Sequence, residues 1–319
     1  MKIVITERDS VGTDIDISCF EEFGEVTSYS NTDNTADGKE RVKDADIIIN
    51  NKLPMNEETL GEAKNVKLIC EFATGFDNVD IEYCKRRGIR VANVRNYCTE
   101  AVAQHTFALA LYLLENLPHY DNYVKSGEYS AQKRFSNFDR SFFELAGKTW
   151  GIIGMGGIGR MVARIATAFG CKVIFYSASG KSTCTDYPRV DFDTLLAQSD
   201  ILSVHCPLSD LTRDLIDAAA LKKMKKSAIL INVARGPVVN NADLYEALIN
   251  DEIAAAGLDV LEHEPLRETN PLSKIKDSSK LFITPHMAWA STEARTRVVT
   301  ENYENIKAFL EGRERNLVV

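Results

Sequence analysis

Short apolar runs alternate with longer amphipathic stretches through most of this 319-residue chain. Parallel strands that are buried on both faces have continuous apolar sequences, and helical crossovers must connect them. The alternation therefore predicts parallel sheets covered by helices on both faces. In the first part of the chain, we expect strands at residues 2–6, 46–50, 67–70 and 90–93, with a helix at 79–87 that ends at Gly88.

A second series of the same kind begins at Thr149. The expected strands are residues 149–153, 172–176, 201–204, 228–232, 255–258 and 281–284. Helices are expected near residues 158–169, 218–224 and 241–250, and a last helix at 292–310. The chain length suits two domains of ordinary size. The fold class is thus α/β, with two doubly wound parallel-sheet units.

A long apolar helix is expected between the two series, at residues 99–117. Thr99 is a suitable N-cap, and we expect Pro118 to end the helix. Residues 120–145 are polar and aromatic without a clear period. They predict a loop with short helical pieces that could hold an oligomer contact.

The composition excludes several classes of protein. The chain has 38 Lys and Arg against 46 Asp and Glu, a net charge of −8, which argues against a general nucleic-acid or anionic-membrane binder. No apolar run approaches the ~20 residues of a membrane helix, and the N-terminus favours a strand over a signal peptide. The seven Cys are scattered without a CxxC pair, so we expect no metal site, no disulfide framework and a cytoplasmic location.

One glycine-rich loop follows a strand directly and opens a helix. Its residues are Gly154, Met155, Gly156, Gly157, Ile158 and Gly159, a G-x-G-x-x-G pattern. In a dinucleotide-binding (Rossmann-like) unit, the first glycine permits the turn, the second lets a pyrophosphate approach, and the third lets helix and strand pack closely. The helix N-terminus then attracts the phosphates. The alternative is a glycine-rich turn without a ligand.

The residue that usually binds the adenosine ribose is missing. An Asp or Glu normally ends the strand after the glycine loop, at the ribose 2′-hydroxyl. Here Ser177 stands at that end, and Lys181 follows in a loop rich in hydroxyl groups. We therefore hypothesise that NADP(H) is accepted. In the alternative, Ser177 bonds the ribose and NAD binds.

Polar side chains follow four strands of the second series, and in open α/β sheets ligands bind at this edge. An Arg anchors a carboxylate, a His transfers a proton, and a carboxylate beside that His stabilises its imidazolium form. Hydride transfer between a nicotinamide and a 2-keto acid needs all three. Singly, Arg235 could instead form a surface ion pair, His263 could be a solvated loop residue, and His205 could be a packed imidazole bonded to a backbone carbonyl. The residues concerned are His205, Arg235, Asp259, Glu262, His263, Glu264 and His286.

Nearly the whole chain resembles the D-isomer-specific 2-hydroxyacid dehydrogenase family. The matching motifs occur in the family's order: ATGFDNVDIEYCKRRGIRVANV, AVAQHTFALAL, ELAGKTWGIIGMGGIGR, HCPL with a following Thr, LINVARGPVV, AAGLDVLEHEPL and ITPHMAWAS. The resemblance implies that Arg235, Glu264 and His286 are catalytic. Glu262, His263 and His205 then become neighbours of the catalytic groups.

The resemblance also implies binding residues. Besides the glycine loop, Ser177 and Lys181, the implied cofactor-lining positions are Cys206, Pro207, Thr212, Val233, Ala234 and Asp259. The implied substrate side comprises Asn51, Ala73, Thr74, Gly75 and Trp289 together with Arg235 and His286. For Trp289, the alternative is a packed aromatic side chain at the domain junction.

The family's topology implies a discontinuous substrate domain. Residues 1–98 and 290–319 would form this flavodoxin-like domain, and residues 99–289 would form the NAD(P)-binding Rossmann domain. The helix from Thr99 would carry a homodimer contact.

The motifs NNKLP, TGFDNVD and HMAWAS most resemble the glycerate dehydrogenase, or hydroxypyruvate reductase, subgroup. The implied reaction converts hydroxypyruvate or glyoxylate to D-glycerate or glycolate. The alternatives are a D-lactate-type or other D-2-hydroxyacid dehydrogenase, and a non-enzymatic NAD(H)-sensing protein like the corepressors that resemble this family.

Overall fold

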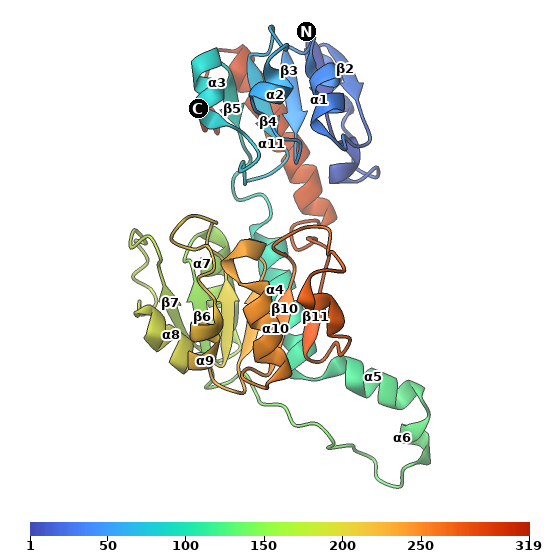
Figure 1. Ribbon diagram of the computed structural model, residues 1–319, viewed down its shortest axis with the longest axis vertical. Coiled ribbons are helices and arrows are strands. Elements are labelled where there is room, and N and C mark those ends of the chain that lie inside the picture. The colour runs from blue at the N-terminus through green and yellow to red at the C-terminus, as the bar shows by residue number, and fades with distance from the viewer. The chain divides into compact units, whose positions relative to one another are not determined.

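The computed structural model describes residues 1–319 and divides the chain into two compact units. Unit 1 comprises Met1–Cys98 and Ala290–Val319, and unit 2 comprises Thr99–Trp289. Both chain ends therefore lie in unit 1, as the blue and red segments show (Figure 1). None of the helices is long and apolar enough to cross a lipid bilayer.

Unit 1 is built on a five-stranded sheet with the order β2-β1-β3-β4-β5. All of its strand pairs are parallel, as the apolar runs predicted. The strands are β1 (Lys2–Ile5), β2 (Glu25–Ser28), β3 (Ile47–Asn50), β4 (Leu68–Glu71) and β5 (Arg90–Ala92). The helices are η1 (Arg8–Val11), η2 (Ser18–Phe23), α1 (Thr35–Val42), α2 (Glu57–Leu60), α3 (Ile81–Arg87) and α11 (Thr292–Leu310).

Unit 2 is built on a six-stranded parallel sheet with the order β11-β10-β9-β8-β6-β7. Its strands are β6 (Thr149–Ile153), β7 (Lys172–Tyr176), β8 (Ile201–Val204), β9 (Ile229–Asn232), β10 (Ala255–Leu258) and β11 (Leu281–Ile283). Its helices are α4 (Thr99–Leu114), α5 (Leu117–Lys125), α6 (Glu128–Ala131), α7 (Gly157–Ala168), α8 (Phe192–Gln198), α9 (Ala218–Lys223), α10 (Asn241–Ile249), η3 (Gly236–Val238) and η4 (Pro271–Lys274).

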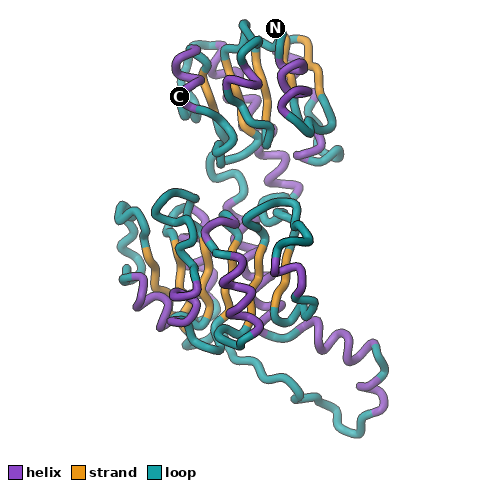
Figure 2. Tube along the Cα trace, viewed as in Figure 1, coloured by secondary structure: helices purple, strands orange, loops and turns teal.

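The order of strands in unit 2 reverses at β6, which lies between β7 and β8. Ligands of open α/β sheets bind at such a switch point, beyond the carboxyl ends of the strands. In each unit the strands form a central layer with helices on both faces (Figure 2). The predicted fold class, two doubly wound α/β units, is confirmed.

Helix α4 packs against α7 and against strands β9 and β10 of unit 2. The ring of Phe107 in α4 stacks on the ring of Trp150 in β6, and their centroids are 4.5 Å apart. Gly257 in β10 makes room for the helix, because a Cβ there would lie 3.1 Å from the Cβ of Leu109. The apolar stretch predicted as a buried helix thus fills the space beside the central strands.

The prediction that Pro118 ends this helix is wrong. Helix α4 already ends at Leu114, and Asn116 has a left-handed backbone with φ of +52°. Pro118 is the second residue of α5, where its missing N–H costs no helical hydrogen bond. Thr99, expected as an N-cap, is the first residue of the helix.

Residues 117–142 carry an unusual number of exposed apolar side chains, and we call this segment the aromatic arm. Figure 1 shows it extending from the rest of unit 2 through α5, α6 and a long loop. Phe135 and Phe138 are 91% and 78% exposed. The exposed apolar side chains of the arm are Leu117, Val124, Tyr129, Phe135, Phe138 and Phe142.

Candidate functional site

The glycine loop joins β6 to α7, as predicted. Gly154 has a φ of +93°, and a Cβ there would lie 2.8 Å from the backbone of Cys206. A Cβ on Gly159 would lie 2.2 Å from the carbonyl oxygen of Gly154. Gly156, in contrast, faces open space. The first and third glycines are thus required by the protein's own packing, and the second leaves room for a ligand.

The N-terminus of α7 is suited to an anion. Its N-cap is Gly156, and no side chain caps the helix there. The N–H groups of a first helical turn and the positive end of the helix dipole favour phosphate groups. Together with the open space at Gly156 and the switch point at β6, this loop fits the pyrophosphate of a dinucleotide.

Ser177 stands directly after β7 and is buried. Its carbonyl oxygen accepts a 3.0 Å hydrogen bond from the N–H of Gly180, which closes a four-residue turn. Lys181 follows the turn with an exposed side chain. The next carboxylate in sequence, Asp186, pairs with Arg160 at 3.6 Å.

The other predicted cofactor-lining residues lie on the loops after β8 and β9. The Thr212 hydroxyl donates to the Pro207 carbonyl at 2.8 Å and fixes the loop that Cys206 begins. After β9, the buried Asn232 accepts from the N–H of Ala234, next to Val233, and donates to the carbonyl of Arg235. The sequence analysis did not single out Asn232, which shapes the turn that carries Arg235. The residues concerned are Cys206, Pro207, Thr212, Val233 and Ala234.

Arg235 lies at the start of η3, and its Nη1 donates to the Ala234 carbonyl at 2.8 Å. A Cβ on Gly236 would lie 1.9 Å from the backbone of Leu261. Only a glycine therefore lets the loop of Arg235 approach the loop that leads to Glu264 so closely. In this way the folded unit brings two of the predicted catalytic positions to neighbouring loops.

His286 and Glu264 form a direct pair. The Nδ1 of His286 lies 2.6 Å from the Oε2 of Glu264. The other oxygen, Oε1, accepts a 3.0 Å bond from the N–H of Leu261, so the carboxylate is held at both ends. A carboxylate on Nδ1 orients the ring and leaves Nε2 to exchange a proton with a ligand. Both side chains are partly exposed, as such an exchange requires.

Asp259, just after β10, holds the turn on which His286 stands. It is 2% exposed. Its Oδ1 accepts from the Thr284 hydroxyl at 2.6 Å and the Met287 N–H at 2.8 Å, and its Oδ2 accepts from the Ala288 N–H at 2.8 Å. Its carbonyl oxygen accepts from the N–H of His286. These bonds hold a backbone that, at a φ of +53° for His286, few side chains adopt readily.

His105 extends this network, although the sequence analysis assigned it no role. Its Nε2 lies 2.9 Å from the Thr284 hydroxyl and 3.6 Å from Oδ1 of Asp259. Burial lowers the pKa of His105, and the neighbouring Asp259 opposes this only in part. A single imidazole on the otherwise apolar face of α4 was the signal that could have marked it.

His205 directly follows β8, and its ring does not make the hydrogen bond to a backbone carbonyl that the sequence analysis considered. Both of its ring nitrogens are buried, and neither has a hydrogen-bond partner, so bonding to a backbone carbonyl is wrong. Burial lowers the pKa of His205 to about 3, which leaves the ring neutral. The backbone of His205 lies against Gly154, so this residue adjoins the glycine loop.

The predicted substrate residues of unit 1 follow β3 and β4. The N–H groups of Asn51 and Lys52 donate to one oxygen, Oε2, of the buried Glu7, at 2.9 and 2.8 Å. The hydroxyl of Thr74 donates to the Val94 carbonyl at 2.6 Å. Glu7 was not among the predicted residues, yet it fixes the loop that begins at Asn51.

The loop Ala73–Thr74–Gly75 is also held through its carbonyl groups. Ala73 accepts from the N–H of Val94 at 2.9 Å, and Thr74 accepts from Nδ2 of Asn93 at 2.7 Å. Its conformation is therefore defined by the adjoining segment after β5.

A second unpredicted carboxyl group, Glu71, ends β4 and is fully buried. Asn50 donates to its Oε1 at 2.9 Å, and Asn78 donates to its Oε2 at 3.3 Å. Burial raises the pKa of Glu71 to about 8, against these two hydrogen bonds. Near neutral pH the side chain is therefore protonated.

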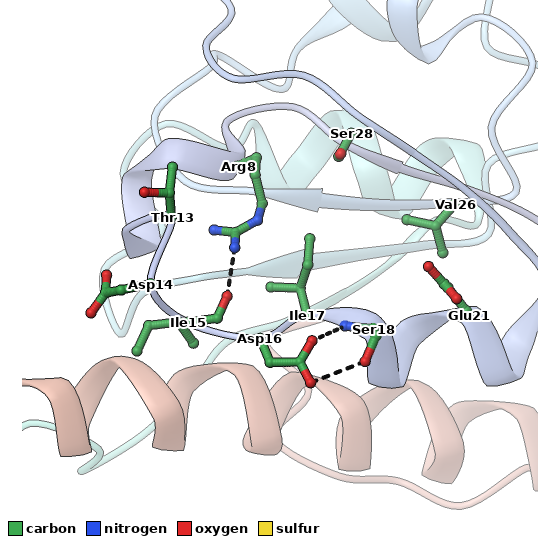
Figure 3. Close-up of a pocket in the computed structure, with 10 residues that line it drawn as sticks. All are labelled: Arg8, Thr13, Asp14, Ile15, Asp16, Ile17, Ser18, Glu21, Val26 and Ser28. Carbon is green, nitrogen blue, oxygen red and sulfur yellow. Dashed lines mark hydrogen bonds between the residues drawn. The ribbon is translucent and has the colours of Figure 1, made fainter.

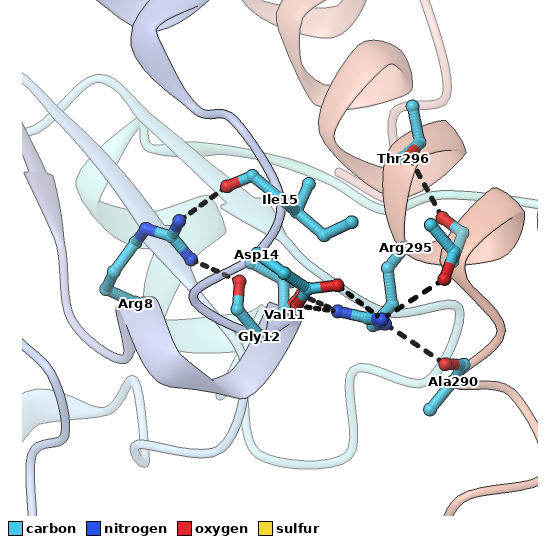
Figure 4. Close-up of polar contacts among 9 residues, drawn as sticks. Arg8, Val11, Gly12, Asp14, Ile15, Ala290, Arg295 and Thr296 are labelled. Carbon is cyan, nitrogen blue, oxygen red and sulfur yellow. Dashed lines mark hydrogen bonds and ion pairs between the residues drawn. The ribbon is translucent and has the colours of Figure 1, made fainter.

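Two arginines of unit 1, Arg8 and Arg295, are unsuited to anchoring a substrate carboxylate, because their guanidinium groups are already bound within the unit. In the cavity of Figure 3, Arg8 donates to the backbone carbonyl of Ile15, and it also donates to that of Gly12. Figure 4 shows Arg295 bound to both oxygens of Asp14, at 2.6 and 2.9 Å. Arg295 also donates to the carbonyl groups of Val11 and Ala290. These guanidinium groups serve the structure of unit 1.

Trp289 is the last residue of unit 2 and is partly buried. All seven cysteines are free thiols. The structure contains no group of three or more His, Cys, Asp or Glu side chains placed to hold a metal ion.

Known proteins match both the NAD-binding part of this chain and its whole length. A family model described as "D-isomer specific 2-hydroxyacid dehydrogenase, NAD binding domain" matches residues 107–288. The chain is 38% identical to a glycerate dehydrogenase of Methylorubrum extorquens, over 99% of this chain and 98% of that protein. It is 37% identical to a hydroxypyruvate reductase of Blautia hydrogenotrophica, over 100% and 99%.

Among solved structures, the chain is similar to an acyclic imino acid reductase, Bsp5, in complex with NADPH and D-Arg. The TM-score is 0.89, the sequence identity is 29%, and the match covers 100% of both chains.

Proposed function

The chain belongs to the D-isomer-specific 2-hydroxyacid dehydrogenases, and we propose that it interconverts hydroxypyruvate or glyoxylate with D-glycerate or glycolate. Members of this family catalyse nicotinamide-linked oxidoreduction of 2-hydroxy acids. The observation that carries the proposal is the His286–Glu264 pair, with Nδ1 and Oε2 2.6 Å apart, on the sheet edge that also carries the glycine loop.

Each catalytic side chain has a proposed task. The bound nicotinamide supplies the hydride for reduction. Arg235 binds the carboxylate of the keto acid and stabilises negative charge that develops on the carbonyl oxygen. His286 donates a proton from Nε2 to that oxygen, while Glu264 on Nδ1 stabilises the positive ring and holds its orientation. In the oxidation direction, His286 accepts the same proton.

We assign cofactor binding to unit 2 and substrate-domain contacts to unit 1. The family model for NAD binding lies within unit 2, which supports the first assignment. The loop Gly154–Gly159 would hold the pyrophosphate. The other proposed cofactor residues are Ser177, Lys181, Cys206, Pro207, Thr212, Val233, Ala234 and Asp259. The proposed substrate contacts besides the catalytic groups are Asn51, Ala73, Thr74, Gly75 and Trp289.

We infer that NADP(H) is accepted as well as NAD(H). Ser177 leaves no carboxylate at the end of β7 to repel a 2′-phosphate, and a relative of the same fold binds NADPH. The test is kcat/KM with NADH and NADPH side by side on one keto acid. A strong preference for NADH would contradict the inference.

We further propose a homodimer in the cytoplasm. The exposed side chains of the aromatic arm, Phe135 and Phe138 above all, favour burial against a second copy. Free thiols at all seven cysteines suit a reducing compartment. Light scattering of the wild type and of a Phe135→Ser/Phe138→Ser variant tests the dimer, and a monomeric wild type would contradict it.

Consumption of reduced cofactor at 340 nm tests the proposed reaction directly. Hydroxypyruvate and glyoxylate should be the best substrates of a panel that also holds pyruvate and bulkier keto acids. Faster turnover of pyruvate would favour a D-lactate-type enzyme instead. Cofactor binding without turnover of any keto acid would favour the non-enzymatic sensor.

A further inference from the structure

Residues 177–191 connect β7 to α8, and the last part of this connection returns to lie beside β7. Arg189 forms a parallel bridge with Phe175, the second-to-last residue of β7. The N–H of Phe175 donates to the Pro188 carbonyl, and the N–H of Val190 donates to the Phe175 carbonyl, both at 3.0 Å. The backbone of Arg189 is therefore fixed beside the strand whose end faces the ribose position.

The side chain of Arg189 is fixed as well. Its Nη1 donates to the Gly180 carbonyl at 2.9 Å, at the far end of the turn that Ser177 begins. Its Nη2 lies 3.5 Å from where a Cβ of Gly180 would be. Because its partner is a neutral carbonyl, the guanidinium keeps its full charge and several free N–H directions. The side chain is exposed, so a ligand can reach it.

The carboxylates of the adjoining segments are already engaged. Asp186 pairs with Arg160 at 3.6 Å. Asp191 caps α8 by accepting from the N–H and the hydroxyl of Thr194. Asp193 pairs with Lys223 at 2.7 Å. None of these three carboxylates forms an ion pair with Arg189, whose guanidinium lies against the turn that Ser177 begins.

Lys181, the cation that the sequence suggested, is held less firmly. Only its backbone N–H is fixed, by a 3.3 Å bond to the hydroxyl of Ser179. An ammonium on a flexible chain loses more freedom when it binds a phosphate, whereas the planar fork of an arginine can bind two phosphate oxygens at once.

We propose that Arg189 is the residue that recognises a 2′-phosphate on the adenosine ribose, with the Ser177 hydroxyl as its partner and Lys181 in a minor role. The proposal rests on the proposed dinucleotide site and names the residue that selects between its two cofactors. It makes an anchored arginine, contributed from the far end of the segment between β7 and α8, the determinant of specificity.

Calorimetric titration of the full-length protein with NADP⁺ and with NAD⁺, without keto acid, tests this apart from catalysis. Arg189→Gln should weaken NADP⁺ binding about 10- to 100-fold, the range for losing hydrogen bonds to a charged group, and change NAD⁺ binding less than about twofold. Arg189→Lys should recover part of the loss. Lys181→Gln should weaken NADP⁺ binding by less than about threefold, as expected for a flexible exposed charge.

Lys172→Gln is the matched control, because it removes one exposed positive charge at the opposite end of β7. In the wild type, added salt should reduce the advantage of NADP⁺ over NAD⁺, and in Arg189→Gln this salt effect should disappear.

Three outcomes would overturn the proposal. Equal losses for both cofactors in Arg189→Gln would make Arg189 structural. A larger loss in Lys181→Gln would transfer the role to Lys181. A wild type that binds NAD⁺ far better than NADP⁺ would remove the 2′-phosphate site while the dinucleotide site stands. If neither cofactor binds to the wild type, the proposed function itself fails.

Discussion

One buried carboxylate in each unit holds a loop of the candidate site, and the two differ in how many of their oxygens accept backbone N–H groups. In unit 2, Asp259 accepts the N–H groups of Met287 and Ala288 on separate oxygens. In unit 1, Glu7 accepts the N–H groups of Asn51 and Lys52 on a single oxygen, Oε2. An amide has one acceptor oxygen, so it can replace Glu7 but not Asp259. The turn of His286 is thus the more tightly specified of the two.

A third buried carboxyl group, Glu71, receives no backbone N–H groups, and its pKa shows the effect of burial. Glu71 of unit 1 receives amide N–H groups from Asn50 and Asn78 only, and it keeps its proton up to a pKa of about 8. The edge of unit 1 therefore contains a neutral hydrogen-bonded cluster, and the edge of unit 2 presents the groups that can transfer a proton.

The largest effect is expected for His286, the imidazole that is paired with Glu264 at the edge of unit 2. His286→Gln should lower kcat by about 10²–10⁴-fold, because it removes positioned acid–base catalysis. The measurement is kcat with hydroxypyruvate and saturating cofactor. His263→Gln, an exposed histidine near Glu264, is the matched control and should keep wild-type kcat. An unchanged kcat in His286→Gln would remove this residue from the mechanism.

Asp259→Asn should have the next largest effect. One N–H or O–H donor would then meet the amide nitrogen, which costs about 1–3 kcal/mol of unfolding free energy for a buried unsatisfied group. The displaced turn should also lower kcat. Urea unfolding and kcat measure the two effects. The control is Asp251→Asn, which breaks an exposed pair with Lys280 and should leave the urea midpoint close to that of the wild type. A fully active, stable Asp259→Asn would break the comparison.

Glu71→Gln should change how stability depends on pH. In the folded chain Glu71 binds its proton up to a pKa of about 8, above the ordinary value of 4.5. The folded state therefore holds an extra proton in this window, and wild-type stability falls as pH rises through it, by at most about 1.4 kcal/mol per pH unit. The neutral glutamine removes this loss.

The urea midpoints of wild type and Glu71→Gln, followed by circular dichroism, should therefore be similar at the low end of this pH window and diverge toward the high end, with the variant more stable. Parallel curves would show that Glu71 is ionised throughout the window.

The smallest effect is expected for Glu7→Gln, because one amide oxygen can accept both N–H groups. Its KM for the keto acid and its unfolding free energy should stay close to those of the wild type. Glu7→Ala should instead leave both N–H groups unsatisfied, cost about 1–3 kcal/mol, and raise KM through the loop of Asn51. If Glu7→Gln is as harmful as Asp259→Asn, the count of acceptor oxygens does not explain the difference.

Local patterns predicted the central elements well. Strands β6, β7, β8 and β10 and helix α11 have the expected bounds, because apolar runs and periods end sharply at polar residues. Among the elements that were not predicted, β2, α1, α2 and α8 are short. β2 is largely exposed, and α1 is mostly polar. Their stability depends on neighbours such as β1, which β2 pairs along its whole length.

The candidate site divides in the same way. The glycine loop and the strand-end residues Arg235, Glu264 and His286 were identified from motifs of contiguous residues. Glu7 and His105 were not, because their roles come from contacts across 44 and 179 residues. No period or spacing in the sequence encodes such pairs.

The sequence by itself determined the two doubly wound sheets and the order in which chemical groups reach their carboxyl edges, since both follow from hydrophobic period and from the backbone freedom of glycine. Only the tertiary structure decided how those groups are held: which oxygen of Asp259 faces which N–H, why Glu71 keeps its proton, and where Arg189 points. These depend on burial and on hydrogen-bond partners that meet only when distant segments pack together.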